Sequence, residues 1–308
     1  MTIAIAASGA RAGGAVRDAL LGAELLGRGA IGGFAVLAIL DEDGRVQHRV
    51  TQRGGVCSLV VPEAWSAARI AAVISSGPDR PEPLIQFLPG SDGVGLVTGH
   101  RLPQRAGRDG SALNAAVLAL LGRGVEPKAA VESVLTANTE ADAGLIAINA
   151  QGAFGWGNTE RVGRRTDLGQ FERDDGASRI AILHNSIFSH EPLAPQVGAL
   201  AWARMKELPG PIDWIRMAAA VPFRLADRDR LHVDAVGNIT AIDSADPYRP
   251  KGLRRTTVVH LGGEVWRRGV CVGHVVTELV ADVVEGVATP CEGETFNILL
   301  MRSNHVAS

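Results

Sequence analysis

Aromatic side chains are scarce in this chain of 308 residues, which has seven Phe, five Trp and one Tyr against 37 Gly. We therefore expect an interior packed closely from small residues. Cysteine is also rare: Cys57, Cys271 and Cys291 contain no Cys-x-x-Cys pair. This argues against a structural zinc or iron–sulfur site and is typical of a reduced cytoplasm. The sequence thus predicts a cytoplasmic protein with no metal and no cofactor.

A surplus of charge of one sign is missing as well. The formal net charge is −2, which offers no basic surface for nucleic acid or an anionic membrane. The longest apolar runs, such as 32–40, are about half as long as a membrane span. A basic segment followed by an apolar core, as in a signal peptide, is not seen at the N-terminus. The expected partner is a small-molecule substrate, with no nucleic acid and no membrane, and a homo-oligomer is left open.

Nucleotide-binding motifs are absent too. The segment 8–14 follows an apolar run and holds three glycines, but its spacing is not Gly-x-Gly-x-x-Gly. The next apolar run, 32–40, leads directly into the turn Asp41–Gly44, which is typical of a hairpin and not of a crossover through a helix. No Walker pattern occurs. These observations argue against a dinucleotide fold.

The periodicity of apolar residues predicts a mixture of hairpins and helices. The expected strands are 2–7, 32–40, 45–51, 56–61, 94–98, 143–149, 154–157 and 179–184, with a hairpin over 231–243. The expected helices are 11–27, 62–75, 112–121, 126–137, 193–208 and 272–284. Strict β-α-β alternation is absent, which favours an α+β class. Residues 161–177 are rich in charge and predict a connection between a core over 1–160 and a C-terminal portion over 178–308.

Thr2 stands directly before the first apolar run. Removal of Met1 would leave Thr2 with a free α-amine beside its hydroxyl on a buried strand. An α-amine titrates near pH 8, so such a residue can be a nucleophile that carries its own base. The alternative interpretation is an ordinary strand at an ordinary N-terminus.

The first half of the chain resembles N-terminal nucleophile (Ntn) hydrolases, most closely class II glutamine amidotransferase domains. The matching pieces are Thr2, the helical segment 16–26, Arg28-Gly29 and the hairpin 33–46. Thr2 stands where those domains have Cys. Uncharacterised Ntn-like proteins carry a helix-rich stretch followed by a hairpin, similar to 116–152 here. Isoaspartyl peptidases and plant-type asparaginases carry a hairpin similar to 144–152. The resemblance implies a four-layer αββα sandwich of the Ntn type, with an additional mixed α/β C-terminal portion.

The same resemblance implies where substrate binds. The segment 97–101, which contains Thr98, His100 and Arg101, is similar to the Gly-His-Thr-Arg segment that holds the substrate carboxylate in amidotransferases. Arg offers a planar fork suited to a carboxylate. Asp142 and Asn158-Thr159 flank the second hairpin and are further candidates for the same cleft.

An oxyanion hole requires hydrogen-bond donors close to the developing charge. The candidates are the backbone amides of Arg53, Gly54 and Gly55, or the side chain of Asn114 or Asn138. A simple bulge at a strand end would equally explain the glycines. The expected activity is hydrolysis of a small amide, with Thr2 and Asn114 as catalytic residues.

Two other functions remain open at this point. The chain can be a non-catalytic binding or assembly protein, or a cysteine hydrolase in which Cys57 acts with His100. His184 and His190 invite comparison with metal ligands, but a spacing of six residues matches no standard pair. His184 at a strand end is more typical of a hydrogen-bonded structural residue.

Overall fold

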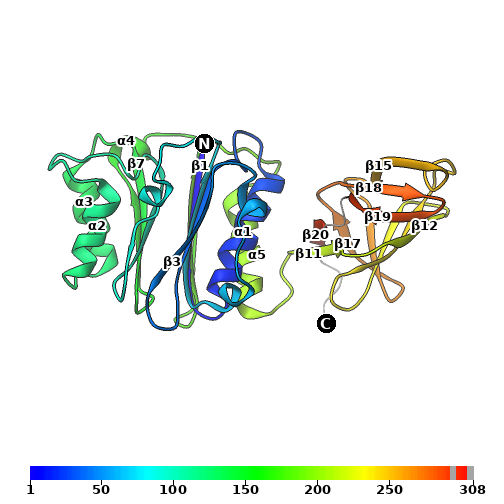
Figure 1. Ribbon diagram of the computed structural model, residues 1–308, viewed down its shortest axis with the longest axis horizontal. Helices are drawn as coiled ribbons and strands as arrows, with labels where there is room; N and C mark the ends of the chain where they lie inside the picture. Colours follow the sequence, from blue (N-terminus) through cyan, green and yellow to red (C-terminus); the bar gives the residue numbers. More distant parts are fainter. Residues whose placement is uncertain (292–295, 304–308) are drawn as a thin grey trace. The chain divides into compact units, whose positions relative to one another are not determined.

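The structure, a computed structural model, describes residues 1–291 and 296–303 (Figure 1). The chain divides between Leu208 and Pro209 into two compact units. Within the described ranges there are five α-helices and twenty β-strands. None of the described helices combines the length and the apolar character that crossing a membrane requires.

The first unit contains two antiparallel sheets. The larger has the strand order β3-β2-β4-β1-β10-β9, formed by β1 (Thr2–Ser8), β2 (Ala35–Leu40), β3 (Val46–Thr51), β4 (Ile70–Ser76), β9 (Leu168–Asp174) and β10 (Arg179–Asn185). The smaller has the order β5-β6-β7-β8, formed by β5 (Gly90–Ser91), β6 (Gly95–Arg101), β7 (Ala143–Asn149) and β8 (Phe154–Asn158). The two sheets pack face to face, because β1 and β4 of the larger contact β6 of the smaller.

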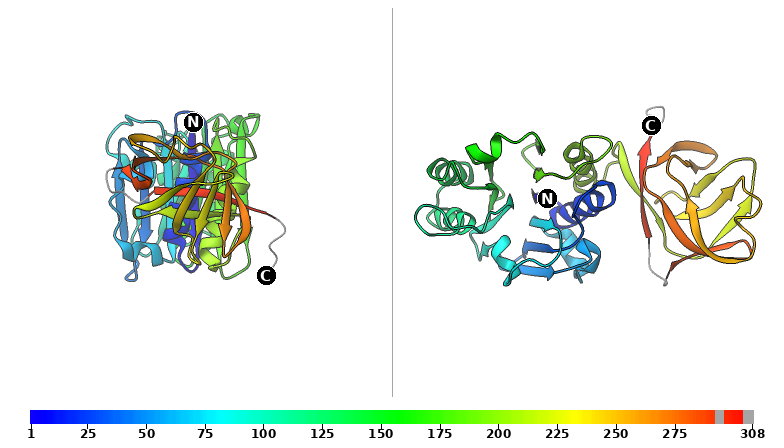
Figure 2. Two further views of the ribbon diagram at one scale, coloured as in Figure 1. Left: turned by 90° about the vertical axis from the view of Figure 1, so that its right-hand side faces the viewer. Right: turned by 90° about the horizontal axis from the view of Figure 1, so that it is seen from above.

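Helices cover the outer faces of both sheets, as Figures 1 and 2 show. On the larger sheet lie α1 (Ala12–Leu26) and α5 (Leu193–Lys206), and on the smaller lie α2 (Leu113–Gly122) and α3 (Pro127–Ala137). One short α-helix, α4 (Glu160–Gly163), follows β8, and three 3-10 helices complete the unit: η1 (Gly55–Ser58), η2 (Glu63–Ala67) and η3 (Leu84–Phe87).

Strand β1 lies near the centre of the larger sheet, paired with β4 on one side and β10 on the other. All seven of its residues are buried. Because side chains alternate along a strand, Ile3 and Ile5 pack under the helices, whereas Ala4 and Ala6 face the other sheet. Small residues on this inner face let the two sheets approach closely, which agrees with the scarcity of aromatic side chains.

The second unit is built from strands, with no α-helix among its described residues. Its ten-stranded sheet has the order β11-β20-β17-β16-β13-β14-β12-β19-β18-β15 and curls around its own core, as the views in Figure 2 show. The strands are β11 (Ile212–Met217), β12 (Val221–Leu225), β13 (Arg230–Val233), β14 (Ile239–Ser244), β15 (Leu253–Val259), β16 (Glu264–Arg267), β17 (Val270–Val275), β18 (Leu279–Val284), β19 (Val287–Pro290) and β20 (Phe296–Arg302).

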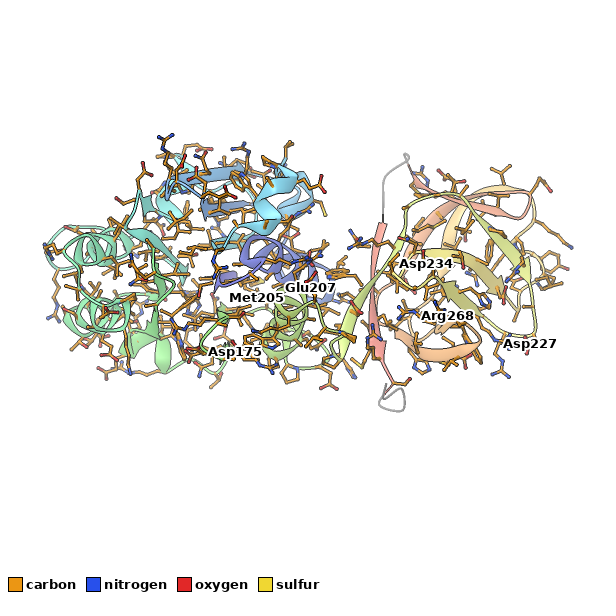
Figure 3. All side chains as sticks on the ribbon, turned by 90° about the horizontal axis from the view of Figure 1, so that it is seen from below. Asp175, Met205, Glu207, Asp227, Asp234 and Arg268 are labelled. Atoms are coloured by element: carbon orange, nitrogen blue, oxygen red, sulfur yellow. The ribbon has the colours of Figure 1, made fainter. Side chains whose placement is uncertain are left out.

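The hairpin predicted over 231–243 is confirmed by β13 and β14, which pair antiparallel. Asp234 lies in the turn between them (Figure 3). Its Oδ1 accepts hydrogen bonds from the backbone N–H groups of Val236 and Asn238, at 3.0 and 2.8 Å. Gly237 supplies the positive φ of 88° that the turn requires.

The predicted fold class is wrong as a description of this chain. A four-layer αββα sandwich with a mixed α/β C-terminal portion was expected, but the chain is rich in strands and has three sheets. The largest of them is the ten-stranded sheet of the second unit, and no α-helix lies among the described residues after Leu208. This sheet is mixed, with β12–β14 and β13–β16 parallel, and by curling it buries one face against itself, so the unit needs no helical layer.

Two predicted helices are wrong for related reasons. Residues 62–75 form only the short η2 and then β4, and residues 272–284 form most of β17 and then β18. Strand β4 is central and buried on both faces, so its continuous apolar run carries no period of two. Residues 272–284 are rich in Val, whose branched side chain favours strands. The strand expected over 56–61 is absent, since η1 occupies residues 55–58.

The division of the chain also differs from the predicted connection over 161–177. That segment contains most of α4 and all of β9, which is the edge strand of the larger sheet. Strand β10 and helix α5 complete the first unit, and the division follows only at Leu208. Edge strands are exposed and tolerate charge, which is why β9 resembles a connection in sequence.

Candidate functional site

Five strands of the first unit bring polar side chains to the same end of the sheets. Thr2 at the start of β1 lies opposite Ser76 at the end of β4 and opposite Asn185 at the end of β10. These three residues follow the alternation of Ala4, so their side chains lie on the face turned toward the smaller sheet. His100 at the end of β6 and Asn158 at the end of β8 approach from that smaller sheet.

His100 links the two sheets at this end and is only 1% exposed. Its Nδ1 lies 3.3 Å from Oδ1 of Asn185, and its Nε2 lies 2.7 Å from the side-chain amide of Asn158. Burial lowers the pKa of His100 below its usual value, which favours the neutral ring. The ring therefore acts as a fixed connection between the strand ends.

Gly144 on β7 makes room for this connection. A Cβ at that position would lie 2.1 Å from Oδ1 of Asn158 and 2.3 Å from Nε2 of His100. Both distances are far below van der Waals contact, so any larger residue would separate the two side chains.

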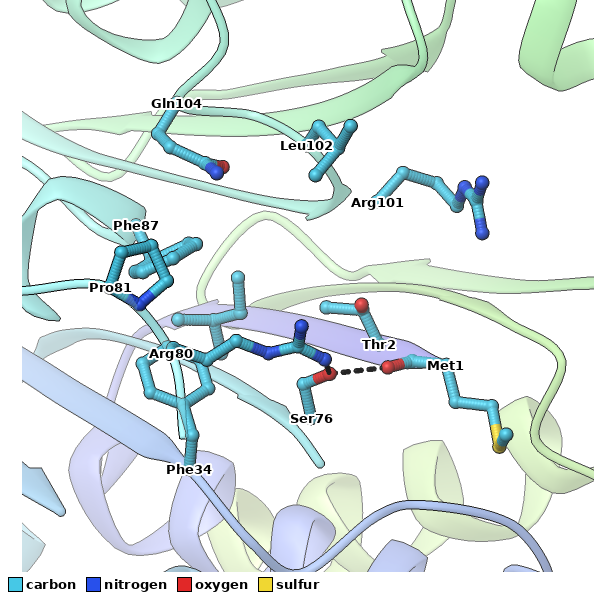
Figure 4. Close-up of a pocket in the computed structure, with 11 residues that line it drawn as sticks. Met1, Thr2, Phe34, Ser76, Arg80, Pro81, Phe87, Arg101, Leu102 and Gln104 are labelled. Carbon is cyan, nitrogen blue, oxygen red and sulfur yellow. Dashed lines mark hydrogen bonds between the residues drawn. The ribbon is translucent and has the colours of Figure 1, made fainter. Parts of the chain in front are cut away.

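A cavity of about 290 Å³ opens beside this cluster (Figure 4). Its polar lining consists of Thr2, Ser76, Arg80, Arg101 and Gln104. Its apolar lining consists of Met1, Phe34, Ile74, Pro81, Phe87 and Leu102. Apolar walls with a few convergent polar groups are the usual composition of a small-molecule site.

Ser76 and Arg80 act on the bond that precedes Thr2. The hydroxyl of Ser76 donates to the carbonyl oxygen of Met1 at 2.5 Å, and Nη2 of Arg80 donates to Oγ of Ser76 at 2.5 Å (Figure 4). A guanidinium behind the hydroxyl makes it a stronger donor. The chain of hydrogen bonds from Arg80 through Ser76 thus polarises the carbonyl group of Met1, which forms the peptide bond with Thr2.

The other arginines near the cavity are paired with carboxylates. Arg101 donates to both oxygens of Asp142, at 2.9 and 2.6 Å, and Arg165 donates to both oxygens of Asp167, at 2.8 and 2.6 Å. The bond from Arg101 lowers the pKa of Asp142, and Arg165 lowers the pKa of Asp167 to about 2. Both carboxylates are charged at neutral pH and hold their arginines in place.

The local field disfavours a protonated amine at the chain start. Burial lowers the pKa of the Met1 amino group, and the charges of Arg101, Arg80 and Arg165 lower it further.

Arg101 has a φ of 67°, a left-handed conformation that is costly for a residue other than glycine. Such strain is often concentrated at ligand-binding and catalytic sites.

The predicted site residues fall into three groups. Thr2, which is 7% exposed, and Arg101 both line the cavity. His100 lies in the layer behind it, and Asp142 and Asn158 are the partners of Arg101 and His100. Thr98 lies deeper in the core, where its hydroxyl donates to the carbonyl oxygen of Val73 at 3.2 Å across the two sheets.

The predicted oxyanion donors do not reach the cavity. Asn114 lies in the first turn of α2, and its Nδ2 donates to the carbonyl oxygen of Gln86 at 2.7 Å. The backbone N–H of Arg53 donates to Oγ1 of Thr51 at 3.3 Å, and its exposed side chain pairs with Asp79 at 2.6 Å. The N–H of Gly55 donates to the carbonyl oxygen of Gly33 at 2.8 Å.

Gly54 and Gly55 serve the backbone instead. Their φ angles are 84° and 57°, which glycine adopts without strain, and they lead the chain into η1. A Cβ on Gly55 would lie 2.5 Å from the carboxylate of Glu24. This close approach allows the N–H of Val56 to bind Glu24 at 3.1 Å.

The structure does not pair Cys57 with His100, because both ring nitrogens of His100 face asparagine amides. His184 is buried, and its Nδ1 has no hydrogen-bond partner among residues 1–291 and 296–303. Burial lowers the pKa of His184 to about 4, and the neighbouring His100 acts in the same direction. No group of three His, Cys, Asp or Glu side chains in the described part of the chain is placed to hold a metal ion.

Sequence reasoning missed Ser76, Arg80 and Gln104. Ser76 was hidden because β4 was predicted as helix, and Arg80 because it follows β4 in a loop rich in Pro. The only available signal was the order of strands, since a residue opposite Thr2 must lie at the end of a neighbouring antiparallel strand. Gln104 carried no signal.

Two family models match the chain. A domain of unknown function (DUF6963) matches residues 2–214, and a second domain of unknown function (DUF7259) matches residues 220–295. No curated protein matches. The two matches are separated by residues 215–219, a few residues after the division between Leu208 and Pro209.

Proposed function

This chain belongs to the DUF6963 family, a domain of unknown function, and we propose that it hydrolyses a small amide with the hydroxyl of Thr2 as nucleophile. The observation that supports this most is the position of Thr2. Its side chain lines a cavity at the end of a central strand, next to Ser76 and Arg80. The resemblance of the opening residues to Ntn hydrolases supports the same chemistry.

The proposal requires that the Met1–Thr2 bond is cleaved. The amine of Thr2 is then free and takes the proton of its own hydroxyl as Oγ attacks the amide carbonyl. The C–N bond breaks, the amine of Thr2 returns the proton to the leaving nitrogen, and an ester on Thr2 remains. Water, activated by the same amine, hydrolyses this ester and regenerates Thr2.

Ser76 is the proposed donor for the developing oxyanion. In the structure its hydroxyl already donates to a carbonyl oxygen, that of Met1, and Arg80 supports it from behind. Loss of one such donor typically costs about 10²- to 10³-fold in kcat. The pairs Arg101–Asp142 and His100–Asn158 fix the surrounding strand ends, so the donor is held in place before substrate binds.

The test combines mass and activity. Intact-mass analysis of natively expressed protein is expected to show loss of Met1, and ammonia release from small primary amides is expected in the wild type. Thr2→Ser should retain activity and Thr2→Ala should lose it. Thr240→Ala, an exposed threonine of the second unit, is the matched control.

Retention of Met1 would exclude Thr2 as an N-terminal nucleophile. Amide hydrolysis at the wild-type rate by Thr2→Ala would do the same. Absence of hydrolysis in a protein that has lost Met1, combined with saturable binding of amides, would favour a non-catalytic binding protein.

A further inference from the structure

Arg80 carries the one guanidinium of the cavity lining that no carboxylate neutralises among the described residues. Arg101, the other arginine of the lining, is bound by Asp142 through two hydrogen bonds. The side-chain partner of Arg80 is the neutral hydroxyl of Ser76. A guanidinium has five N–H donors, so most of those of Arg80 are available to a ligand. An unneutralised cation in a confined site favours an anionic ligand.

The backbone around Arg80 is held from outside. The N–H of Arg80 donates to Oε1 of Gln52 at 2.9 Å, and its carbonyl oxygen accepts from Nε2 of Gln52 at 2.7 Å. This two-point contact fixes the loop that carries the guanidinium. With its backbone held by Gln52 and its guanidinium bound to Ser76, Arg80 loses little conformational freedom when a ligand binds.

The nearest acidic residues of this loop are turned to other partners. Asp79 accepts two hydrogen bonds from Arg53, at 3.2 and 2.6 Å. Glu82 accepts from Nε2 of Gln52 at 3.0 Å and from the N–H of Leu84 at 2.9 Å. Local carboxylates that could neutralise Arg80 are therefore engaged, and its charge stays directed to the cavity.

Gln104 offers a second recognition group. Its Oε1 is buried without a hydrogen-bond partner in the described part of the chain, and its side chain points toward the cavity (Figure 4). A buried acceptor without a partner is costly, so a ligand that donates an N–H to it gains binding energy. The rings of Phe34 and Phe87 lie 4.9 Å apart, edge to face, and form an apolar wall beside it.

We infer that the ligand of this cavity is a small amide that also carries a carboxylate, with Arg80 binding the carboxylate and Gln104 accepting an N–H. The inference rests on the proposed function for the identity of the reacting group. The cavity of about 290 Å³ has room for a small molecule that carries both groups. Succinamate has this composition, and succinamide is its neutral analogue.

Binding of these two probes tests the inference without hydrolysis. Isothermal titration calorimetry is run on the full chain carrying Thr2→Ala, at neutral pH and low salt. Succinamate is expected to bind at least about tenfold more tightly than succinamide, since a hydrogen bond between a guanidinium and a carboxylate is stronger than one to a neutral amide. Arg80→Gln should abolish this preference, and Arg80→Lys should retain part of it.

The matched control is Arg17→Gln, which removes the same charge from an exposed position of α1 and should leave the preference unchanged. Gln104→Leu should weaken both probes about equally. Equal binding of the two probes by the parent protein, or an unchanged preference in Arg80→Gln, would overturn the inference. So would the absence of binding of either probe at millimolar concentration.

The inference and the proposed function fail in different ways. A preference that depends on Arg80, found together with hydrolysis that does not depend on Thr2, rejects the nucleophile and keeps the carboxylate site. Hydrolysis that depends on Thr2, found without a preference for succinamate, rejects the carboxylate site alone. Should Arg80→Gln fail to fold, Arg80→Lys and the salt dependence of succinamate binding decide, because an ion pair weakens with salt.

Discussion

Glu24 on α1 gives the protein a stability that depends on pH. Its carboxylate accepts the N–H of Val56 at 3.1 Å from both oxygens and the hydroxyl of Ser75 at 3.4 Å. Burial raises its pKa from the ordinary 4.5 to about 7, although these hydrogen bonds act in the opposite direction. The folded protein thus holds a proton on Glu24 at pH values where the unfolded chain has lost it.

The sign and size of the effect follow from proton linkage. Between pH 4.5 and about 7 the folded state binds more protons than the unfolded state, so the free energy of unfolding falls as pH rises. A tenfold change in proton affinity is about 1.4 kcal/mol, so a pKa moved from 4.5 to about 7 corresponds to about 3 kcal/mol. The contribution is fully present below pH 4.5 and is lost above about pH 7.

Glu24→Gln removes this titration and keeps an acceptor for Val56. The free energy of unfolding is measured by urea denaturation with linear extrapolation at about pH 4, below the ordinary pKa of 4.5, and at about pH 8. The variant should match the wild type at the lower pH and exceed it by about 3 kcal/mol at the higher pH. Glu63→Gln, an exposed glutamate of η2, is the control and should show no such difference.

The comparison of variants isolates Glu24 from the other groups that titrate in this range. If Glu24→Gln is less stable than the wild type at the higher pH, burial of the charge is not the dominant cost. A difference between variant and wild type that does not change with pH would likewise contradict the reasoning.

Two further predictions concern the strand ends. Gly144→Ala should lower the free energy of unfolding by about 1–3 kcal/mol, because its Cβ would clash with Asn158 and His100. Gly122→Ala, where the Cβ meets open space, is the control and should not lower it. Equal urea midpoints for the two variants would refute the account. The His184 ring should stay neutral as the pH is lowered to about 5, since burial lowers its pKa to about 4. Imidazole NMR signals of His184 that titrate near pH 6.5 would show that the ring is not buried as described.

The sequence predicted much of the first unit because its patterns are local. The turn at Asp41–Gly44 and the apolar run before it predicted a hairpin, and β2 and β3 confirm it. Thr2 was identified from its place before an apolar run, and β1 confirms that strand. Arg101 was identified at the end of another strand and lines the same cavity.

The rest of the site depended on strand β4. Read as helix, Ile70–Ser76 had no reason to end beside Thr2, and the following Arg80 stayed in an unassigned loop. A central strand buried on both faces lacks the alternation that separates strand from helix. Asn185 was missed for a different reason, since its importance comes from its contact with His100, 85 residues away in sequence.

The second unit was the least predictable part of the chain. Val272 and its neighbours up to Val284 were expected as a helix, although β-branched residues favour strands. The pairing of β12 with both β14 and β19 joins strands that are far apart in sequence. Such long-range pairing leaves no local pattern, which is why the ten-stranded sheet was not expected.

The most direct measurement of the central claim is the mass of the N-terminal peptide after a brief reaction with succinamate and an acid quench. We predict a peptide that begins at Thr2 and carries one succinyl group on that residue. The same peptide from Thr2→Ala should carry none. A peptide that begins at Met1, or a succinyl group on another residue, would contradict Thr2 as the nucleophile.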